Sequence, residues 1–282
     1  MLPARLPDVV SMCLIALLWQ AHPRYRLVLA ANRDEFHDRP TLPLARWTDT
    51  PDVLGGRDAL HGGGWLALRG HRLVAVTNVR RPPEREGRSR GELVADLVRA
   101  DAPATQALDA LAPDAPGFRP FNLLVHDGDT LAFATNLPGV PADGDDGRAF
   151  ATRLLTPGLH GMSNGALDAP WPKTEALAAR LDAWRGSPAG QGDAPDLAPL
   201  FDALADPAIA ADAALPDTGV GLDLERFLSS AFIRSERYGT RASTVVLVAD
   251  DHARIVERRF GPEGVFLGET DLRVPVAAAA RT

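Results

Sequence analysis

Short apolar runs separated by polar turns recur along the chain and predict strands joined in hairpins. The first two runs, residues 13–19 and 25–31, are apolar except for Arg26 and flank a turn that contains Pro23. Continuous apolar runs of this length are typical of strands buried on both faces. Three further hairpins are predicted over residues 65–77, 121–135 and 243–260.

Helical signals fall in two groups. Ser89 followed by Glu92 forms a capping box before an apolar face and predicts a helix that ends near Arg99. A second helix is expected over residues 103–111. After Trp171, apolar side chains at helical spacing predict a longer helix, with shorter helices over 197–204 and 224–232.

Sequential hairpins imply antiparallel sheets, and helices grouped apart from them imply layers outside those sheets. The pattern therefore favours an α+β fold of the four-layer αββα type. An ordinary two-layer α+β fold would give a similar pattern and stays open at this point. With 282 residues, 45% of them hydrophobic, we expect residues 13–282 to form a single domain.

Two segments are predicted to be irregular. Residues 41–51 are rich in proline, and residues 55–64 bring five glycines together. The glycine cluster lacks a Gly-Lys-Ser/Thr motif, so a tight bend beside a cleft is favoured over a phosphate-binding loop. Arg57 and Asp58 are expected to line that cleft. Lys173, which begins the longer helix, is expected on the surface, where it could bind a carboxylate.

The candidate chemistry lies in the first hairpin. Cys13, the only cysteine, opens the first strand, and four polar residues, 32–35, come directly after the second. Antiparallel pairing places the start of one strand beside the end of the next, so Cys13 is expected to face these residues. A cation beside a thiol favours the thiolate, so Arg33 makes Cys13 a candidate nucleophile. A lone cysteine in an apolar strand is more often simply a small buried residue.

The blocks that carry a family resemblance are distributed along the chain: Met12-Cys13-Leu14-Ile15, Ala31-Asn32-Arg33-Asp34-Glu35-Phe36, Leu54-Gly55-Gly56-Arg57-Asp58, Gly161-Met162-Ser163-Asn164, Pro170-Trp171-Pro172-Lys173 and Tyr238-Gly239-Thr240-Arg241. Together they resemble the NRDE-motif family, which includes the animal transport-and-Golgi-organisation proteins. The resemblance implies a fold similar to the N-terminal-nucleophile hydrolases. Animal relatives are linked to lipid and haem handling.

The position of Cys13 directly after Met12 strengthens the catalytic interpretation. If Met12 is the initiator and is removed, Cys13 gains an α-amine with a pKa of roughly 7.7–8.0, which could serve as its own general base. Residues 1–12 are interrupted by Pro3, Arg5 and Pro7 and do not form a secretion signal. They are either a mis-assigned start, which we favour, or a short propeptide.

Among such hydrolases, the branch that acts on bile salts and penicillin V is similar in arrangement. The residues at the matching positions are Cys13, Arg33 with Asp34, Asn78, Asn164 and Arg241. The resemblance implies that Arg241 favours the thiolate, that Asp34 orients the α-amine and that both asparagines hold an oxyanion. In that branch the arginine precedes the asparagine, whereas Asn32 here precedes Arg33, which leaves the roles of residues 32–34 open.

Two functions are therefore expected from sequence. The first is hydrolysis or acyl transfer on a small-molecule amide through a Cys13 thioester, without a cofactor. The alternative is a non-catalytic carrier or chaperone of lipid, acyl-CoA or haem on the same fold, with Cys13, His22 or His61 as a haem ligand. The histidine spacing predicts no metal site.

Charge and hydropathy limit the partners. The net charge of −7 argues against nucleic acid as a main partner. No stretch approaches the roughly 20 apolar residues of a membrane helix, so stable membrane insertion is not expected. A single cysteine excludes an internal disulfide, and a cytoplasmic location is expected. The oligomeric state is left open by the sequence.

Overall fold

The computed structural model describes residues 12–80, 86–137 and 150–276. Within these residues, thirteen strands form one six-stranded and one seven-stranded sheet, and every strand pair is antiparallel. The six-stranded sheet has the order β10 (Gly158–Met162), β1 (Met12–Trp19), β2 (Leu27–Phe36), β11 (Tyr238–Val248), β12 (His252–Phe260), β13 (Phe266–Pro275).

The seven-stranded sheet follows the chain from one edge to the other. Its order is β3 (Thr41–Arg46), β4 (Leu54–Asp58), β5 (Leu66–Arg69), β6 (Arg72–Asn78), β7 (Phe121–His126), β8 (Leu131–Thr135), β9 (Ala151–Leu154). Each of its strands therefore pairs with its neighbour in sequence, as hairpin turns require.

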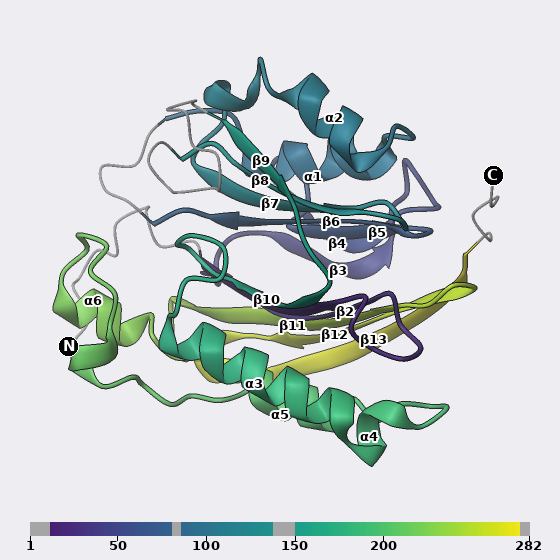
Figure 1. Cartoon of the computed structure of the whole chain (residues 1–282). Helices are drawn as coiled ribbons and strands as arrows, with labels where there is room; N and C mark the ends of the chain where they lie inside the picture. The colour runs from purple at the N-terminus through teal and green to yellow at the C-terminus, as the bar shows by residue number, and fades with distance from the viewer. Residues whose placement is uncertain (1–11, 81–85, 138–149, 277–282) are drawn as a thin grey trace.

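Helices cover the outer face of each sheet (Figure 1). The seven-stranded sheet carries α1 (Arg90–Arg99) and α2 (Ala104–Leu111), and the six-stranded sheet carries α3 (Pro172–Gly186), α4 (Pro188–Gln191) and α5 (Ala198–Leu204). A short helix, α6 (Leu222–Phe227), lies at one end. The four-layer αββα arrangement predicted from the sequence is confirmed.

Three apolar clusters hold the layers together. The largest lies between the two sheets and includes Ile15, Leu29 and Phe133. A second packs α1 and α2 on the seven-stranded sheet, and a third packs α3 and α5 on the six-stranded sheet, where Leu14 and Ala30 contribute. Strands β1 and β2 are apolar on both faces because each face meets a different cluster.

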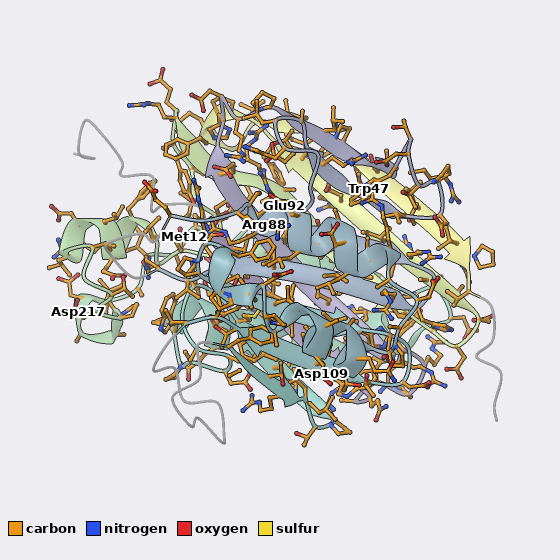
Figure 2. All side chains as sticks on the ribbon, turned by 90° about the horizontal axis from the view of Figure 1, so that it is seen from above. Met12, Trp47, Arg88, Glu92, Asp109 and Asp217 are labelled. Carbon is orange, nitrogen blue, oxygen red and sulfur yellow. The ribbon has the colours of Figure 1, made fainter. Side chains whose placement is uncertain are left out.

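The start of α1 shows the predicted capping box. Ser89 Oγ accepts a hydrogen bond from the backbone N–H of Gly91 at 3.3 Å, and Glu92 Oε1 accepts one from that of Ser89 at 3.2 Å. Seen from above, Arg88 and Glu92 lie between Met12 and Trp47 (Figure 2). Ser89, Arg90 and Glu92 line one cavity together with Cys13, so the capped end of α1 lies near the start of β1.

Several boundaries differ from the sequence-based predictions. Residues 41–51 are not irregular throughout, because edge strand β3 occupies their first half, and the first glycines of the cluster lie in β4. A Cβ on Gly55 would lie 2.7 Å from the Leu66 carbonyl oxygen, so close strand packing explains that glycine. The expected bend is found at Gly62, where φ is +70°. The helix expected over 224–232 ends at Phe227, and β13 was not foreseen.

Candidate functional site

The register of the first hairpin fixes the site. Cys13 pairs with Arg33, and Met12 pairs with Asp34. Residues 32–35 lie within β2 rather than after it, so the predicted neighbours are confirmed although the strand end was wrong. Because side chains alternate along a strand, Cys13 and Arg33 face the space between the sheets. Met12 and Asp34 face the helical layer.

Cys13 lies beside a cavity of about 550 Å³ at the end of the two sheets. The cavity is lined by β2, by β4, by the loop before β5 and by the first turn of α1. Arg33, Glu35, Asn78 and Arg90 contribute polar side chains, and Trp65 contributes an aromatic ring. The cavity can therefore take an organic molecule with both polar and apolar parts.

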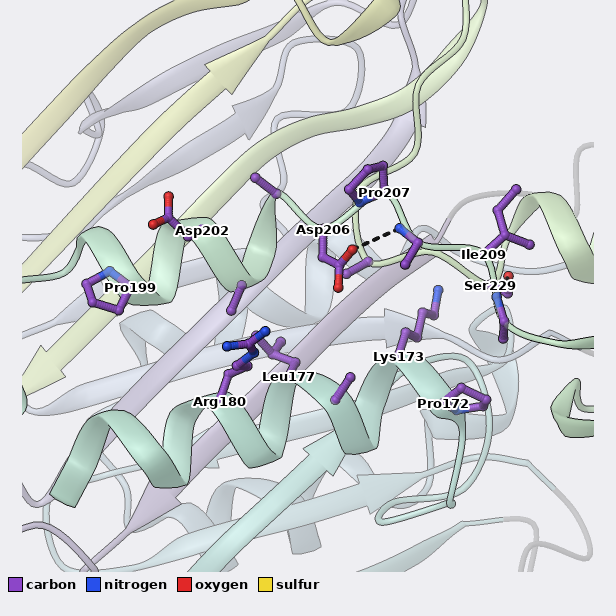
Figure 3. Close-up of a pocket in the computed structure, with 16 residues that line it drawn as sticks. Pro172, Lys173, Leu177, Arg180, Pro199, Asp202, Asp206, Pro207, Ile209 and Ser229 are labelled. Carbon is purple, nitrogen blue, oxygen red and sulfur yellow. Dashed lines mark hydrogen bonds between the residues drawn. The ribbon is translucent and has the colours of Figure 1, made fainter. Parts of the chain in front are cut away.

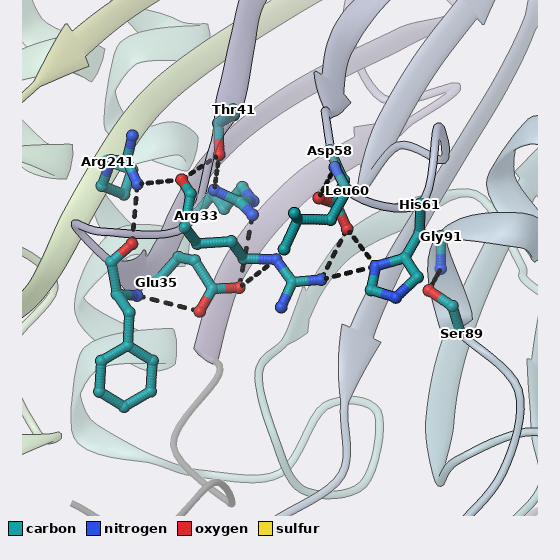
Figure 4. Close-up of polar contacts among 11 residues, drawn as sticks. Arg33, Glu35, Thr41, Asp58, Leu60, His61, Ser89, Gly91 and Arg241 are labelled. Atoms are coloured by element: carbon teal, nitrogen blue, oxygen red, sulfur yellow. Dashed lines mark hydrogen bonds and ion pairs between the residues drawn. The ribbon is translucent and has the colours of Figure 1, made fainter.

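A chain of charged groups runs along one wall of this cavity (Figure 4). Glu35 Oε2 lies 3.4 Å from Arg33 Nη2 and 3.7 Å from Arg39 Nε. Arg39 Nη2 reaches Asp58 Oδ2 at 2.6 Å, and His61 Nδ1 lies 3.2 Å from the same oxygen. Glu35 thereby fixes Arg33 opposite Cys13, and Asp58 lines the cavity as predicted, together with Arg57.

The thiol of Cys13 is in its protonated form in this chain. Burial is the main cause, and together with the Asp34 carboxylate it raises the pKa of Cys13 to about 12, although Arg33 and Arg90 act in the opposite direction. The expected thiolate is therefore not obtained from the neighbouring arginine alone, because a buried site penalises the anion more than one cation favours it.

Asp34 is the second buried ionisable group of the site. Its Oδ1 accepts a hydrogen bond from Thr240 Oγ1 at 2.6 Å, whereas its Oδ2 has no hydrogen-bond partner among the described residues. Burial raises the pKa of Asp34, and the charge of Lys173 is the largest opposing influence.

Lys173 is not on the surface, as the sequence suggested. Its side chain is 95% buried, and Nζ donates to the Leu228 carbonyl at 2.9 Å. Burial lowers its pKa, and Asp34 is the largest influence in the other direction. The prediction failed because the first turn of α3 lies against the six-stranded sheet, where a helix-start residue is covered by Leu228 and its neighbours.

The two candidate asparagines have different environments. Asn78 lines the cavity together with Cys13. Asn164 is fully buried, its Nδ2 donates to the Asn78 carbonyl at 3.0 Å, and its Oδ1 accepts from Ser163 Oγ at 3.2 Å. Asn164 therefore holds the backbone of Asn78 in place and does not itself line the cavity.

Arg241 lies at a bulge of β11 and not at the thiol. Its Nη1 donates to the carbonyl oxygens of Phe36 and Arg39 at 2.7 and 3.1 Å. These contacts hold the chain that leaves β2, while the cations that lower the pKa of Cys13 are Arg33 and Arg90. The expected pairing of Arg241 with the thiolate is corrected accordingly.

The candidate haem ligands lie apart. His61 lines the same cavity as Cys13, whereas His22 packs its ring against Trp184 and accepts hydrogen bonds at Nδ1 from backbone N–H groups of Arg24 and Tyr25. Within the described ranges, no three His, Cys, Asp or Glu side chains are placed to share a metal ion. No described helix is long and apolar enough to cross a bilayer.

Three members of the site were given no specific role from the sequence. Glu35 was expected only as one of the polar residues that face Cys13, although an acid two residues from Arg33 on one strand shares its face and could have been assigned as its partner. Arg90 follows the capping serine directly and could have been placed at the helix start. The burial of Lys173 had no local signal, since it depends on how α3 lies against the sheet.

Comparisons with known proteins cover most of the chain. The family model described as "Transport and Golgi organisation 2" matches residues 12–262. The chain is 34% identical over 268 residues to the human transport and Golgi organization protein 2 homolog and 33% identical over 274 residues to the Bos taurus homolog, in each case with 88% of this chain and 92% of the relative covered. Among solved structures, a Caenorhabditis elegans ortholog of N-acylethanolamine-hydrolyzing acid amidase aligns with a TM-score of 0.41 and 13% identity, covering 84% of this chain and 92% of that chain.

Proposed function

Since this chain belongs to the transport and Golgi organisation 2 family, whose name specifies no reaction, we propose its chemistry from the site: a cysteine N-terminal-nucleophile amidohydrolase or acyltransferase acting on a small-molecule amide. The unpartnered Oδ2 of Asp34 carries this proposal. Buried polar atoms are seldom left without a partner. An α-ammonium on Cys13, one residue from the Met12 that pairs with Asp34, would supply one.

The lack of an α-ammonium in the full chain also explains why the Cys13 thiol is protonated there. While Met12 precedes Cys13, the nitrogen of Cys13 is an amide, and burial and Asp34 oppose a thiolate. Removal of the preceding residues turns that nitrogen into an amine that can accept the thiol proton, and the resulting ammonium stabilises the thiolate. The active form in this proposal therefore begins at Cys13.

The reaction follows two balanced steps. The Cys13 sulfur attacks the amide carbonyl, the α-amine takes the thiol proton and passes it to the leaving amine, and a thioester remains. Water, or an acceptor amine in the transferase case, then attacks the thioester while the neutral α-amine takes a proton from it, and the released sulfur regains that proton from the resulting α-ammonium. Asn78 lies in the cavity beside Cys13 and is the proposed donor to the oxyanion.

The test compares the full chain with a chain expressed from Met12, from which the initiator is removed. We expect only the chain that begins at Cys13 to hydrolyse members of an acyl-amide panel and to form a thioester adduct visible by intact mass. Asn78→Ala should lower kcat by about 10²–10³ with little change in KM. Arg180→Met, outside this cavity, serves as the control.

One observation supports a carrier as the second candidate. The cavity beside Cys13 is lined by five arginines against four acidic residues, and this excess of cations suits an anionic ligand such as acyl-CoA, a fatty acid or haem. The arginines are Arg33, Arg39, Arg57, Arg90 and Arg119. In that case Cys13→Ala keeps full affinity for the ligand in a thermal-shift titration. Tight binding with no turnover of any amide would replace the hydrolase proposal by the carrier.

A further inference from the structure

Lys173 is the only lysine in a chain that contains 30 lysine and arginine residues. Elsewhere the chain uses arginine for every cation. At this position the side chain is buried, with Nζ bound to a single carbonyl, that of Leu228. An ammonium has three donors, so this amine keeps hydrogen-bonding capacity beyond that contact.

Lys173 and Asp34 belong to one buried cluster. Lys173 Nζ donates to the Leu228 carbonyl, and Leu228 packs with Met12, the register partner of Asp34. Asp34 also has the largest favourable effect on the ammonium of Lys173, and Lys173 has the largest favourable effect on the carboxylate of Asp34. The other ionisable and charged groups that influence the pair come from the surrounding elements: Cys13 of β1, Arg33 and Glu35 of β2, Arg80 after β6, Glu225 of α6 and Tyr238 of β11.

These neighbours leave Lys173 as the main cation for Asp34. Arg80 is committed to Glu225, with Nη2 and Oε2 2.8 Å apart and both side chains buried. Arg33 faces the opposite side of β2 and contacts Glu35. Without Lys173, the Asp34 carboxylate would be a buried charge whose hydrogen-bond partner among the described side chains is the hydroxyl of Thr240, an arrangement that favours the neutral acid.

On its other side, Lys173 lines a second cavity of about 580 Å³ on the outer face of the six-stranded sheet, between α3 and α5 (Figure 3). Arg180 and Leu177 of the same helix also line this outer cavity. Lys173 thus lies between solvent in the outer cavity and the acidic group behind Cys13.

We propose that Lys173 is a positioning residue of the Cys13 site: its ammonium keeps Asp34 ionised, so that Asp34 can hold the α-amine of Cys13 in place. This inference rests on the proposed function for the role of the amine. The Lys173–Asp34 pair itself can be tested without catalysis, in the full chain.

The first experiment measures the melting temperature from pH 5 to pH 9. In Lys173→Met, the folded-state pKa of Asp34 rises further above its unfolded value of 3.8, so stability relative to wild type falls as pH increases. In Asp34→Asn, the pKa of Lys173 falls further below 10.5, so stability falls as pH decreases. The difference in melting temperature between each variant and wild type should change by about 3 °C or more between pH 5 and pH 9.

The double variant Lys173→Met/Asp34→Asn removes both charges and should show neither pH dependence. Arg180→Met, on the same helix and in the same outer cavity, should follow wild type at every pH. The proposal would be overturned if the melting temperature of Lys173→Met lay below that of wild type by the same amount at every pH. It would also be overturned if the effects of the two single variants simply added in the double variant. Either result would show that Lys173 only fills space.

The second experiment uses the chain that begins at Cys13. Lys173→Met should lower kcat for the amide near neutral pH by about tenfold or more, move the acidic limb of the kcat profile to higher pH, and leave KM unchanged; Lys173→Arg should restore part of the rate. If wild type hydrolyses the amide and the pH profile of kcat is the same in Lys173→Met, the positioning role of Lys173 is overturned and the proposed function stands. Absence of hydrolysis in wild type overturns the proposed function, and the melting experiment then decides whether Lys173 and Asp34 interact.

Discussion

At the scale of single residues, the site depends on opposing effects at Cys13. Cys13 is buried, with 5% of the residue exposed, so desolvation outweighs the attraction of Arg33, which lies directly opposite in the register. A residue pattern can show that a cation is adjacent to a thiol. It does not show how much water is excluded from both, and the sign of the pKa shift depends on that quantity.

This balance predicts two rates of alkylation. In the full chain at pH 7.5, Cys13 should react with iodoacetamide at least about 100-fold more slowly than a free thiol, because burial raises its pKa to about 12. In the chain that begins at Cys13, the reaction should be faster than that of a free thiol. The rate is read from intact mass against time.

Two arginine variants provide the matched comparison. Arg33→Met should slow the alkylation of the chain that begins at Cys13, whereas Arg241→Met, whose guanidinium binds only backbone carbonyls in the described residues, should not. Equal alkylation rates in the full chain and the shortened chain would contradict the role given to the α-amine.

At the scale of elements, α1 links local sequence to the site most directly. Its capping box satisfies two backbone N–H groups at the helix start. The residues that make the box, Ser89 and Glu92, also line the cavity beside Cys13. The stability of one helical turn therefore affects the shape of the candidate site.

Replacing the cap should cost measurable stability. Ser89→Ala removes the acceptor for Gly91 N–H and should lower the free energy of unfolding by about 1 kcal/mol in urea denaturation. Glu92→Gln keeps an oxygen that can accept from Ser89 N–H and should change the value by less than about half of that. A Ser89→Ala effect no larger than that of Glu92→Gln would show that the cap is not a determinant of α1.

Elements were predictable where local chemistry decides them. The hairpin at Asp127–Asp129, the capping box of α1 and the register of β1 with β2 all follow from turn residues, caps and apolar runs. Strand β3 was not predictable in this way, because its residues are largely exposed and it exists only by pairing with β4. The burial of Lys173 and the position of Arg241 depend on contacts between distant segments, about which local pattern carries no information.

At the scale of the whole molecule, a fully buried histidine takes part in the packing between the two sheets. His126 of β7 is fully buried, its Nδ1–H donates to the His71 carbonyl at 2.7 Å, and its ring packs edge-on against Trp19 at 5.1 Å. Burial lowers its pKa to about 4. The two sheets thus pack around a neutral imidazole.

Acid should therefore destabilise the whole fold through His126. The folded-state pKa lies below the unfolded value of 6.5, so its contribution is present above pH 6.5 and is lost as pH falls toward 4, because the unfolded chain takes up the proton first. The loss between pH 7 and pH 5 should be about 2 kcal/mol. Urea denaturation at the two pH values measures it.

Two variants separate the contribution of His126 to the acid dependence of stability from the contributions of other titrating groups. His126→Gln should be less stable at pH 7 but should lose about 2 kcal/mol less on acidification than wild type. His61→Gln, at an exposed position, should keep the wild-type dependence. An unchanged acid dependence in His126→Gln would assign the effect to other groups.

Because Lys173 is the only lysine, a lysine-specific protease can report on the local stability of the fold. An endoproteinase that cuts only after lysine has a single site in the entire chain, and that site lies in the first turn of α3 against the six-stranded sheet. Cleavage can occur only when this turn detaches, so the digestion rate under native conditions measures the free energy of that opening. Because a molecule bound in the outer cavity would contact the same turn, any ligand found there should slow the cut in proportion to its occupancy.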